Sequence, residues 1–91
     1  MSKYVSLDDI CLYCQVSGES GRLLVDSLSN AAEEFLLSID ITPNDRNRER
    51  FALTVKAMTL HELENPGAER PEGIQQMINN LKFQRCKNAV L

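Results

Sequence analysis

The hydrophobic residues of segment 21–39 recur with the spacing of an α-helix. At about 100° per residue, the apolar side chains fall on one continuous arc and the polar side chains on the other. The apolar arc comprises Leu24, Val25, Leu28, Ala31, Ala32, Phe35, Leu36 and Ile39. Because this arc is wider than the seam of a two-stranded coiled coil, the segment predicts an amphipathic helix that packs against several neighbours.

Leu23 and Leu37 depart from this pattern, since both lie in the polar arc, on the same heptad line as Asn30. Isolated exposed leucines are ordinary on protein surfaces. A pair aligned along one helix instead indicates a contact outside the fold.

A shorter helix is predicted ahead of this one. Ser6 has the residue type of an N-cap and is followed three positions later by the acidic Asp9, so the helix should start at Leu7. Its apolar stripe is Leu7, Ile10, Cys11 and Cys14. The glycines and serines of residues 17–21 favour a turn, which places the end of the helix near Gln15.

The third predicted helix has apolar residues on two sides. Thr42 as N-cap and Pro43 at the first helical position should begin it, and it should run to about Glu64. One face carries Phe51, Ala52, Val55, Met58 and Leu63, and the roughly opposite face carries Leu53, Ala57 and Leu60. A helix that is apolar on two sides is covered on two sides. The second cover comes either from another chain or, if this is simply the central helix, from the domain itself.

A final helix is predicted from Pro71, after the stop signal Asn65–Pro66–Gly67. Its apolar face is Ile74, Met77, Ile78 and Leu81. With no strand candidate, the fold class is all-α: a small bundle of about four helices, with a short first helix, two long helices and a short C-terminal helix. We divide the chain into a helical domain, residues 1–81, and a basic tail, residues 82–91.

Composition limits the possible classes of protein. The chain has 91 residues, 43% hydrophobic, which suits one small soluble domain. We expect a cytosolic protein that does not enter a membrane, because there is no long apolar run and no signal-peptide core at the start.

Charge is unevenly distributed along the chain. The net charge of −3 argues against a general nucleic-acid binder. All 13 acidic residues precede position 82, whereas Lys82, Arg85 and Lys87 make the tail basic. The tail therefore either contacts a negatively charged partner or simply places cations where the dipole of a helix end favours them.

Three cysteines and one histidine raise the question of a zinc site. Cys11 and Cys14 form a C-x-x-C pair that Cys86 and His61 would complete. However, both residues of the pair lie on the predicted core stripe, where cysteine acts as a small hydrophobe. His61 lies on a polar strip near Thr54 and Arg50, without the nucleophile and orienting acid that catalysis requires. We therefore expect no metal, no cofactor and no enzymatic activity.

Three arginines, Arg46, Arg48 and Arg50, fall in the first turns of the third helix, where the helix dipole disfavours cations. They either meet phosphate or the carboxylates of a partner, or are neutralised locally by Asp45 and Glu49. One functional class that these residues permit is therefore a small helical DNA-binding or regulatory protein, with this helix as recognition helix.

The order of these pieces resembles the head-tail connector (adaptor) family of tailed bacteriophages, often described as DNA-packaging proteins. The matching features are the opening VSLDD with Tyr13 in the first helix, the second helix LLVDSLSNAAEEFL, the Glu64–Asn65 end of the third helix, and the closing segment PEGIQQMINNL. The resemblance covers residues 5–82. Cys14 and Leu63 depart from it, since the family usually has an aliphatic and an aromatic residue there.

The resemblance implies a structural protein of the virion neck, assembled in the cytoplasm of the host bacterium. Many copies would form a ring under the phage portal protein, extend the DNA channel and offer a docking surface to the next neck or tail-completion protein. DNA would pass through without sequence-specific binding. We assign Leu23, Leu37, Leu53, Ala57 and Leu60 to the oligomer interface, and Lys82, Arg85 and Lys87 to the contact with the portal.

Overall fold

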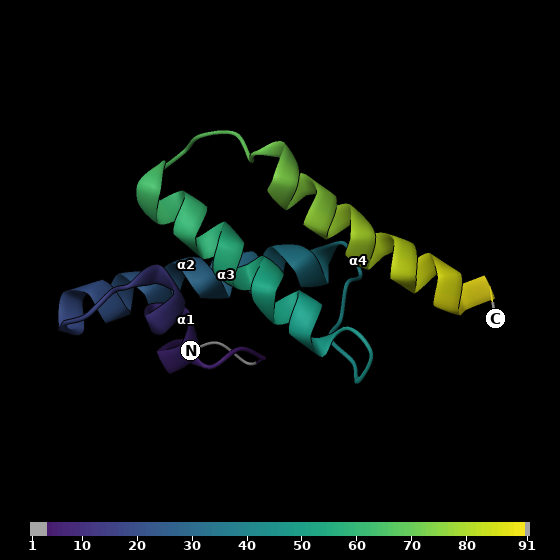
Figure 1. Ribbon diagram of the computed structural model, residues 1–91, viewed down its shortest axis with the longest axis horizontal. Helices are drawn as coiled ribbons and strands as arrows, with labels where there is room; N and C mark the ends of the chain where they lie inside the picture. Colours follow the sequence, from purple (N-terminus) through teal and green to yellow (C-terminus); the bar gives the residue numbers. More distant parts are fainter. Residues whose placement is uncertain (1–3, 91) are drawn as a thin grey trace.

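The computed structural model describes the backbone of residues 4–90 and the side chains of residues 4–82. Within them the chain forms four α-helices and no strand: α1 (Leu7–Cys14), α2 (Glu19–Ser38), α3 (Arg48–Glu64) and α4 (Glu72–Val90) (Figure 1). The all-α prediction is confirmed. The last helix begins one residue after Pro71 and continues through the segment that we separated as a tail. Figure 1 shows the C-terminal turns of α4 extending beyond the other three helices.

α1 has the predicted bounds and the predicted inner face. Ser6 occupies the N-cap position with extended backbone, although its hydroxyl makes no capping hydrogen bond. The helix ends because Gln15 adopts the left-handed conformation, with φ 56°, and the N–H of Val16 donates to the carbonyl of Cys11. Ile10 and Cys11 are buried, and Leu7 and Cys14 pack against the core from its edge.

α2 begins after Gly18, whose φ of 87° a side chain would disfavour. It ends where Asp40 turns left-handed and the N–H of Ile41 donates to the carbonyl of Leu36. Its buried face is rotated relative to the prediction, because Ser29 and Glu33 are buried whereas Leu24 is 51% exposed. α1 and α3 both pack against α2, and the Ser29 hydroxyl is accommodated in the buried face because it donates to the carbonyl of Asp26 at 3.1 Å.

α3 begins later than predicted, and the assignment of Thr42 as its N-cap is wrong. Residues 45–47 form a turn, and Asn47 occupies the N-cap position. The N–H of Asn44 donates to Asn47 Oδ1 at 2.6 Å, and the N–H of Asn47 returns a bond to Asn44 Oδ1 at 3.0 Å. Asn47 Nδ2 also donates to the carbonyl of Thr42 at 3.2 Å. The side chains of Asn44 and Asn47 therefore hold the loop before α3 by hydrogen bonds, at the point where Thr42 and Pro43 were expected to begin the helix.

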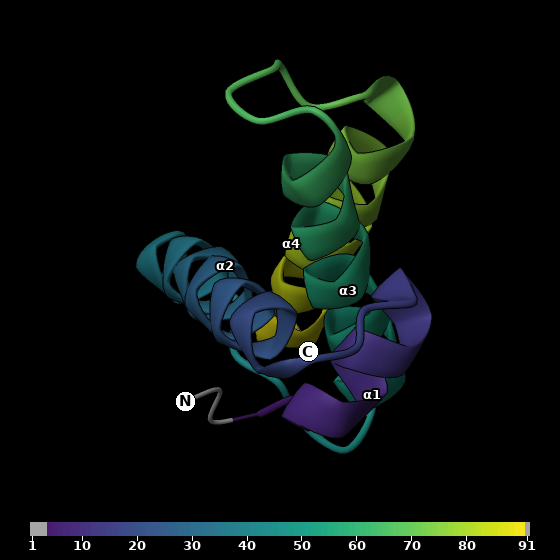
Figure 2. The same ribbon diagram turned by 90° about the vertical axis from the view of Figure 1, so that its left-hand side faces the viewer.

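α3 is the central helix, since it packs against each of the other three (Figure 2). Its buried side carries Phe51, Val55 and Met58. The Phe51 and Tyr4 rings pack edge to face, with their centroids 5.9 Å apart. Two buried threonines join this face because each hydroxyl donates to a backbone carbonyl one turn earlier: Thr54 to Arg50 and Thr59 to Val55. The placement of Thr54 on a polar strip is therefore wrong.

Candidate functional site

The residues assigned to an oligomer interface lie on two helices, α2 and α3. On α2, Leu23 is 63% exposed and Leu37 is half-buried. On α3, Leu53 is 47% exposed, and Ala57 and Leu60, one and two turns further on, are half-buried. Ala57 packs against the core from its edge, so it offers less free surface than the leucines. The assigned residues therefore come from two different helices, with Leu23 and Leu53 the most exposed of them.

Further exposed apolar side chains lie on α1 and on the flank of α2. Leu12 is 79% exposed and Tyr13 is 41% exposed. Neither belongs to the predicted interface, although position 12 falls opposite the buried stripe of α1 on a helical wheel and was detectable from the pattern. Leu24 was also missed, because the sequence pattern placed it on the buried face of the second helix.

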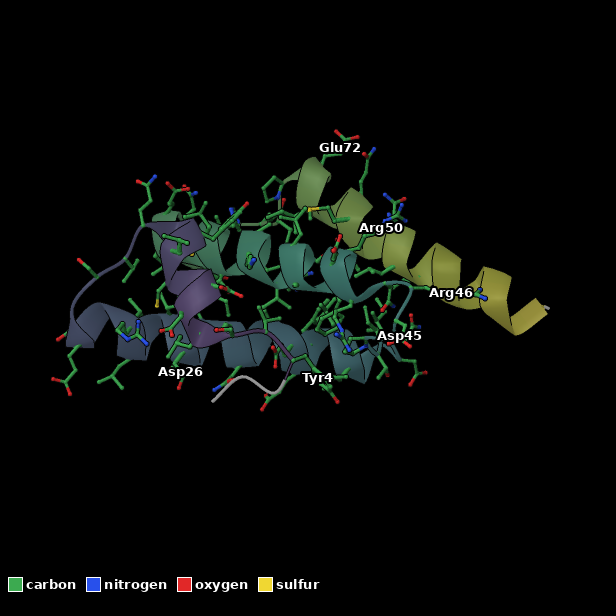
Figure 3. All side chains as sticks on the ribbon, turned by 60° about the horizontal axis from the view of Figure 1, so that its bottom comes forward. Tyr4, Asp26, Asp45, Arg46, Arg50 and Glu72 are labelled. Carbon is green, nitrogen blue, oxygen red and sulfur yellow. The ribbon has the colours of Figure 1, made fainter. Side chains whose placement is uncertain are left out.

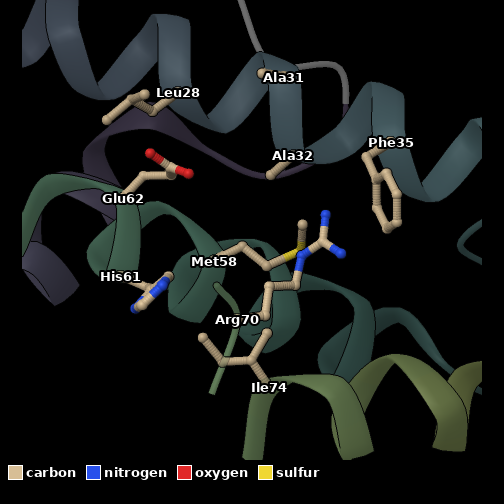
Figure 4. A pocket seen from close by; sticks show the side chains of 9 residues that line it. All are labelled: Leu28, Ala31, Ala32, Phe35, Met58, His61, Glu62, Arg70 and Ile74. Atoms are coloured by element: carbon tan, nitrogen blue, oxygen red, sulfur yellow. The ribbon is translucent and has the colours of Figure 1, made fainter. Parts of the chain in front are cut away.

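A groove of about 180 Å³ lies where α2, α3, the loop 65–71 and α4 converge (Figure 4). One wall is the flank of α2, the other is formed by α3 and α4, and most lining side chains are apolar. The lining residues are Leu28, Ala31, Ala32, Phe35, Met58, His61, Glu62, Arg70 and Ile74. Arg70 reaches across from the loop, with its guanidinium carbon 4.1 Å from the centroid of the Phe35 ring.

The polar groups of this groove are sparsely paired. Among the described residues, Arg70 has no hydrogen bond or ion pair beyond its contact with Phe35. His61 Nε2 is buried and has no hydrogen-bond partner within the same part of the chain. Glu62 accepts a long hydrogen bond, 3.4 Å, from the N–H of Gly67. His61 therefore lines an apolar groove, which the sequence did not indicate.

The cysteine pair is part of the core. Cys11 is 3% exposed and Cys14 is half-buried at the edge of the core. Burial, followed by the nearby Cys11 and Glu64, raises the pKa of the Cys14 thiol. Over residues 4–82, no three His, Cys, Asp or Glu side chains gather as metal ligands would. The side chain of Cys86, the third cysteine of the zinc hypothesis, lies outside the described residues.

The arginine cluster precedes and opens α3, at the end of the molecule where α2 leads into α3 (Figure 3). Arg46, Arg48 and Arg50 are all exposed, and together with Asp45 and Glu49 they line a shallow polar depression. Arg48 lies 3.9 Å from Asp45, an exposed pair that contributes little to stability. The local acidic residues therefore offset part of the positive charge that phosphate would require.

Of the residues assigned to the portal contact, Lys82 is exposed on α4. The side chains of Arg85 and Lys87 lie outside the described residues, where the backbone continues as helix.

None of the helices in the described part of the chain is both long enough and apolar enough to cross a membrane. Comparison with known proteins adds no relative: no family model, no curated protein and no solved structure matches this chain.

Proposed function

We propose that this chain is a structural subunit of a head-tail connector of a tailed bacteriophage. In this proposal copies of the chain form a ring under the portal protein, extend the DNA channel in the virion neck, and present a surface to the next neck or tail-completion protein. The resemblance in the order of helices and in the closing segment PEGIQQMINNL suggests the family.

The observation that carries the proposal is the apolar surface left over after folding. Within residues 4–82, thirteen hydrophobic residues already form a buried core, yet Leu12, Leu23, Leu24 and Leu53 remain between 47% and 79% exposed. They come from three helices and point in different directions. A subunit of a closed ring needs two different surfaces, because each copy contacts one neighbour on either side.

Charge is consistent with a channel that passes DNA without holding it. All 13 acidic residues lie in residues 1–81, so this part of the chain is net negative. A channel lined with basic side chains would instead attract phosphate and slow the passage of DNA. The cations at Lys82, Arg85 and Lys87 are assigned to the portal, because they make the segment after Leu81 basic while the preceding 81 residues are net acidic.

The test of the ring is the size of the particles formed by the purified protein, alone and with portal protein. Light scattering coupled to size exclusion, followed by negative-stain microscopy, should show ring-sized particles in at least one of the two samples. Leu23→Ser and Leu53→Ser should each reduce assembly while leaving the circular dichroism spectrum of the monomer unchanged. A monomer in both samples, even at high concentration, would contradict the proposal.

The test of the portal contact is deletion of residues 82–91, which leaves Leu81 in place. Portal binding should be lost, while the helical signal of the remaining domain is retained. Undiminished binding of the truncated chain would show that the assignment of Lys82, Arg85 and Lys87 is wrong.

A second function is favoured by the exposure of Arg46, Arg48 and Arg50 around the start of α3. A small DNA-binding regulator would use these side chains to contact phosphates, with affinity that falls as salt is raised. Gel-shift assays at low and moderate salt distinguish the two functions. Salt-sensitive duplex binding by a monomer or dimer would favour the regulator, and its loss in Arg46→Ala/Arg50→Ala would locate the site.

A further inference from the structure

α1 presents one apolar side chain at the centre of its outer face. Leu12 is 79% exposed, more than any other large hydrophobic residue of the described chain. Its neighbours on the same face are Asp8 and Asp9, which precede it by four and three positions. Asp8 is engaged by Arg22 at 2.6 Å within the same chain. Asp9 is exposed and has no hydrogen bond or ion pair among the described residues.

The groove between α2 and α4 has the complementary character. Its apolar walls, formed by Phe35, Met58 and Ile74 among others, enclose about 180 Å³. Cavities of about 150 Å³ accept benzene, so the space suffices for one branched aliphatic side chain. At its mouth stands Arg70, which stacks on the Phe35 ring and has no hydrogen bond or ion pair among the described residues. The groove could therefore accept the Leu12 side chain of another copy, while Arg70 at its mouth pairs with the Asp9 carboxylate of that copy.

The two surfaces belong to different parts of the molecule. In two perpendicular views, the loop that carries Arg70 lies at the opposite edge of the molecule from α1 (Figure 1, Figure 2). Leu12 is 79% exposed and does not line the groove, so it does not fill the groove of its own copy. Contact between these surfaces joins copies head to tail, and such a contact either closes into a ring or grows into a filament.

We infer that Leu12 of one copy inserts into the groove of the next copy, with Asp9 facing Arg70. This inference rests on the proposed ring and identifies one contact within its interface, in addition to Leu23 and Leu53. It starts from Leu12 because Leu12 is the most exposed of the large hydrophobic residues described and lies one turn from Asp9, a carboxylate with no ion pair among the described residues. Burying a leucine and pairing two free charges across one contact gives both affinity and orientation.

Charge reversal tests the pairing in both directions. Asp9→Arg places a cation opposite Arg70, and Arg70→Glu places an anion opposite Asp9, so each variant alone should associate at least about tenfold more weakly than the wild type. Combining both changes in one chain, Asp9→Arg/Arg70→Glu, restores opposite charges at every junction for any number of copies, because the introduced arginine of each copy faces the introduced glutamate of the next. The double variant should therefore regain wild-type assembly in sedimentation velocity.

Controls separate the contact from the fold. Asp45→Arg makes the same change of charge at an exposed position in the turn before α3, outside the residues assigned to the interface, and should assemble normally. Leu12→Ser should weaken association without touching either charge. Thermal unfolding of each variant is measured as well, because Asp9 lies in the first turn of α1, where a cation opposes the helix dipole.

The outcomes distinguish this inference from the proposed function. If the wild type assembles only with portal, the same comparison is made on those portal-bound rings. Rings that form equally well from Asp9→Arg, Arg70→Glu and Leu12→Ser would overturn the contact and leave the connector proposal standing. Failure of the double variant to recover would also overturn the pairing. A wild type that never assembles, alone or with portal, would overturn both.

Discussion

The asparagine pair before α3 offers a direct test of how this chain begins its central helix. Asn47 is 7% exposed, and its side chain accepts from the N–H of Asn44 at 2.6 Å and donates to the carbonyl of Thr42 at 3.2 Å. Asn47→Ala removes both bonds and leaves two backbone groups without these partners. Because a backbone group left unpaired costs about 1–3 kcal/mol when buried and less where water reaches it, we expect a loss of about 2 kcal/mol.

The matched control is Thr42→Ala. The Thr42 side chain is exposed and its hydroxyl has no hydrogen bond among the described residues, so its removal should cost less than about 0.5 kcal/mol. If Thr42 were the N-cap, as the sequence pattern predicted, Thr42→Ala would instead cost about 1 kcal/mol of stability. The two variants therefore discriminate between the loop of the structure and the loop of the pattern.

Urea unfolding, followed by circular dichroism at the helical band, measures both free energies. For a domain of this size, a loss of about 2 kcal/mol also lowers the melting temperature by roughly 8–16 °C. A change of less than about 0.5 kcal/mol in Asn47→Ala, or a larger change in Thr42→Ala than in Asn47→Ala, would refute the assignment of Asn47 to the N-cap. An unchanged denaturant slope would show that both variants unfold as the wild type does.

Burial, conformation and charge each give a further prediction. Phe51→Ala should destabilise by about 3–5 kcal/mol in the same urea assay, because its ring is 1% exposed, and Leu53→Ala, 47% exposed, serves as the milder comparison. Gly18→Ala should cost about 1 kcal/mol, since its φ is 87° and no contact within 4 Å opposes a methyl group; no measurable loss would show that the turn relaxes. In a Cys86→Ser background, the raised pKa should make Cys14 react with iodoacetamide more slowly in the folded than in the urea-unfolded chain below about pH 8.5. The same shift means that the folded state holds this proton more tightly, so its contribution to stability is complete below the unfolded pKa and is lost as the pH rises through the folded pKa.

The helix boundaries marked by local chemistry were predictable from the sequence. α1 begins at Leu7 as predicted, and Gln15 ends it where the serines and glycines indicated a turn. The boundary before α3 was not predictable in this way, because Thr42–Pro43 and Asn44–Asn47 are both competent starts. The choice between them depends on the carbonyl of Thr42 and the N–H of Asn44 being within reach of the Asn47 amide, which only the folded loop arranges.

The sequence by itself determined that the chain forms four helices and which face of each is mainly apolar, because these follow from a period of 3.6 residues and from local stop signals. It could not decide which part of a wide apolar face is covered. On α2, Ser29 and Glu33 are buried, while Leu24 stays exposed and Phe35 lines an open groove. Coverage depends on where neighbouring helices pass, a property of long-range packing. The groove, and Arg70 at its mouth without an ion pair among the described residues, were therefore decided by the tertiary structure alone.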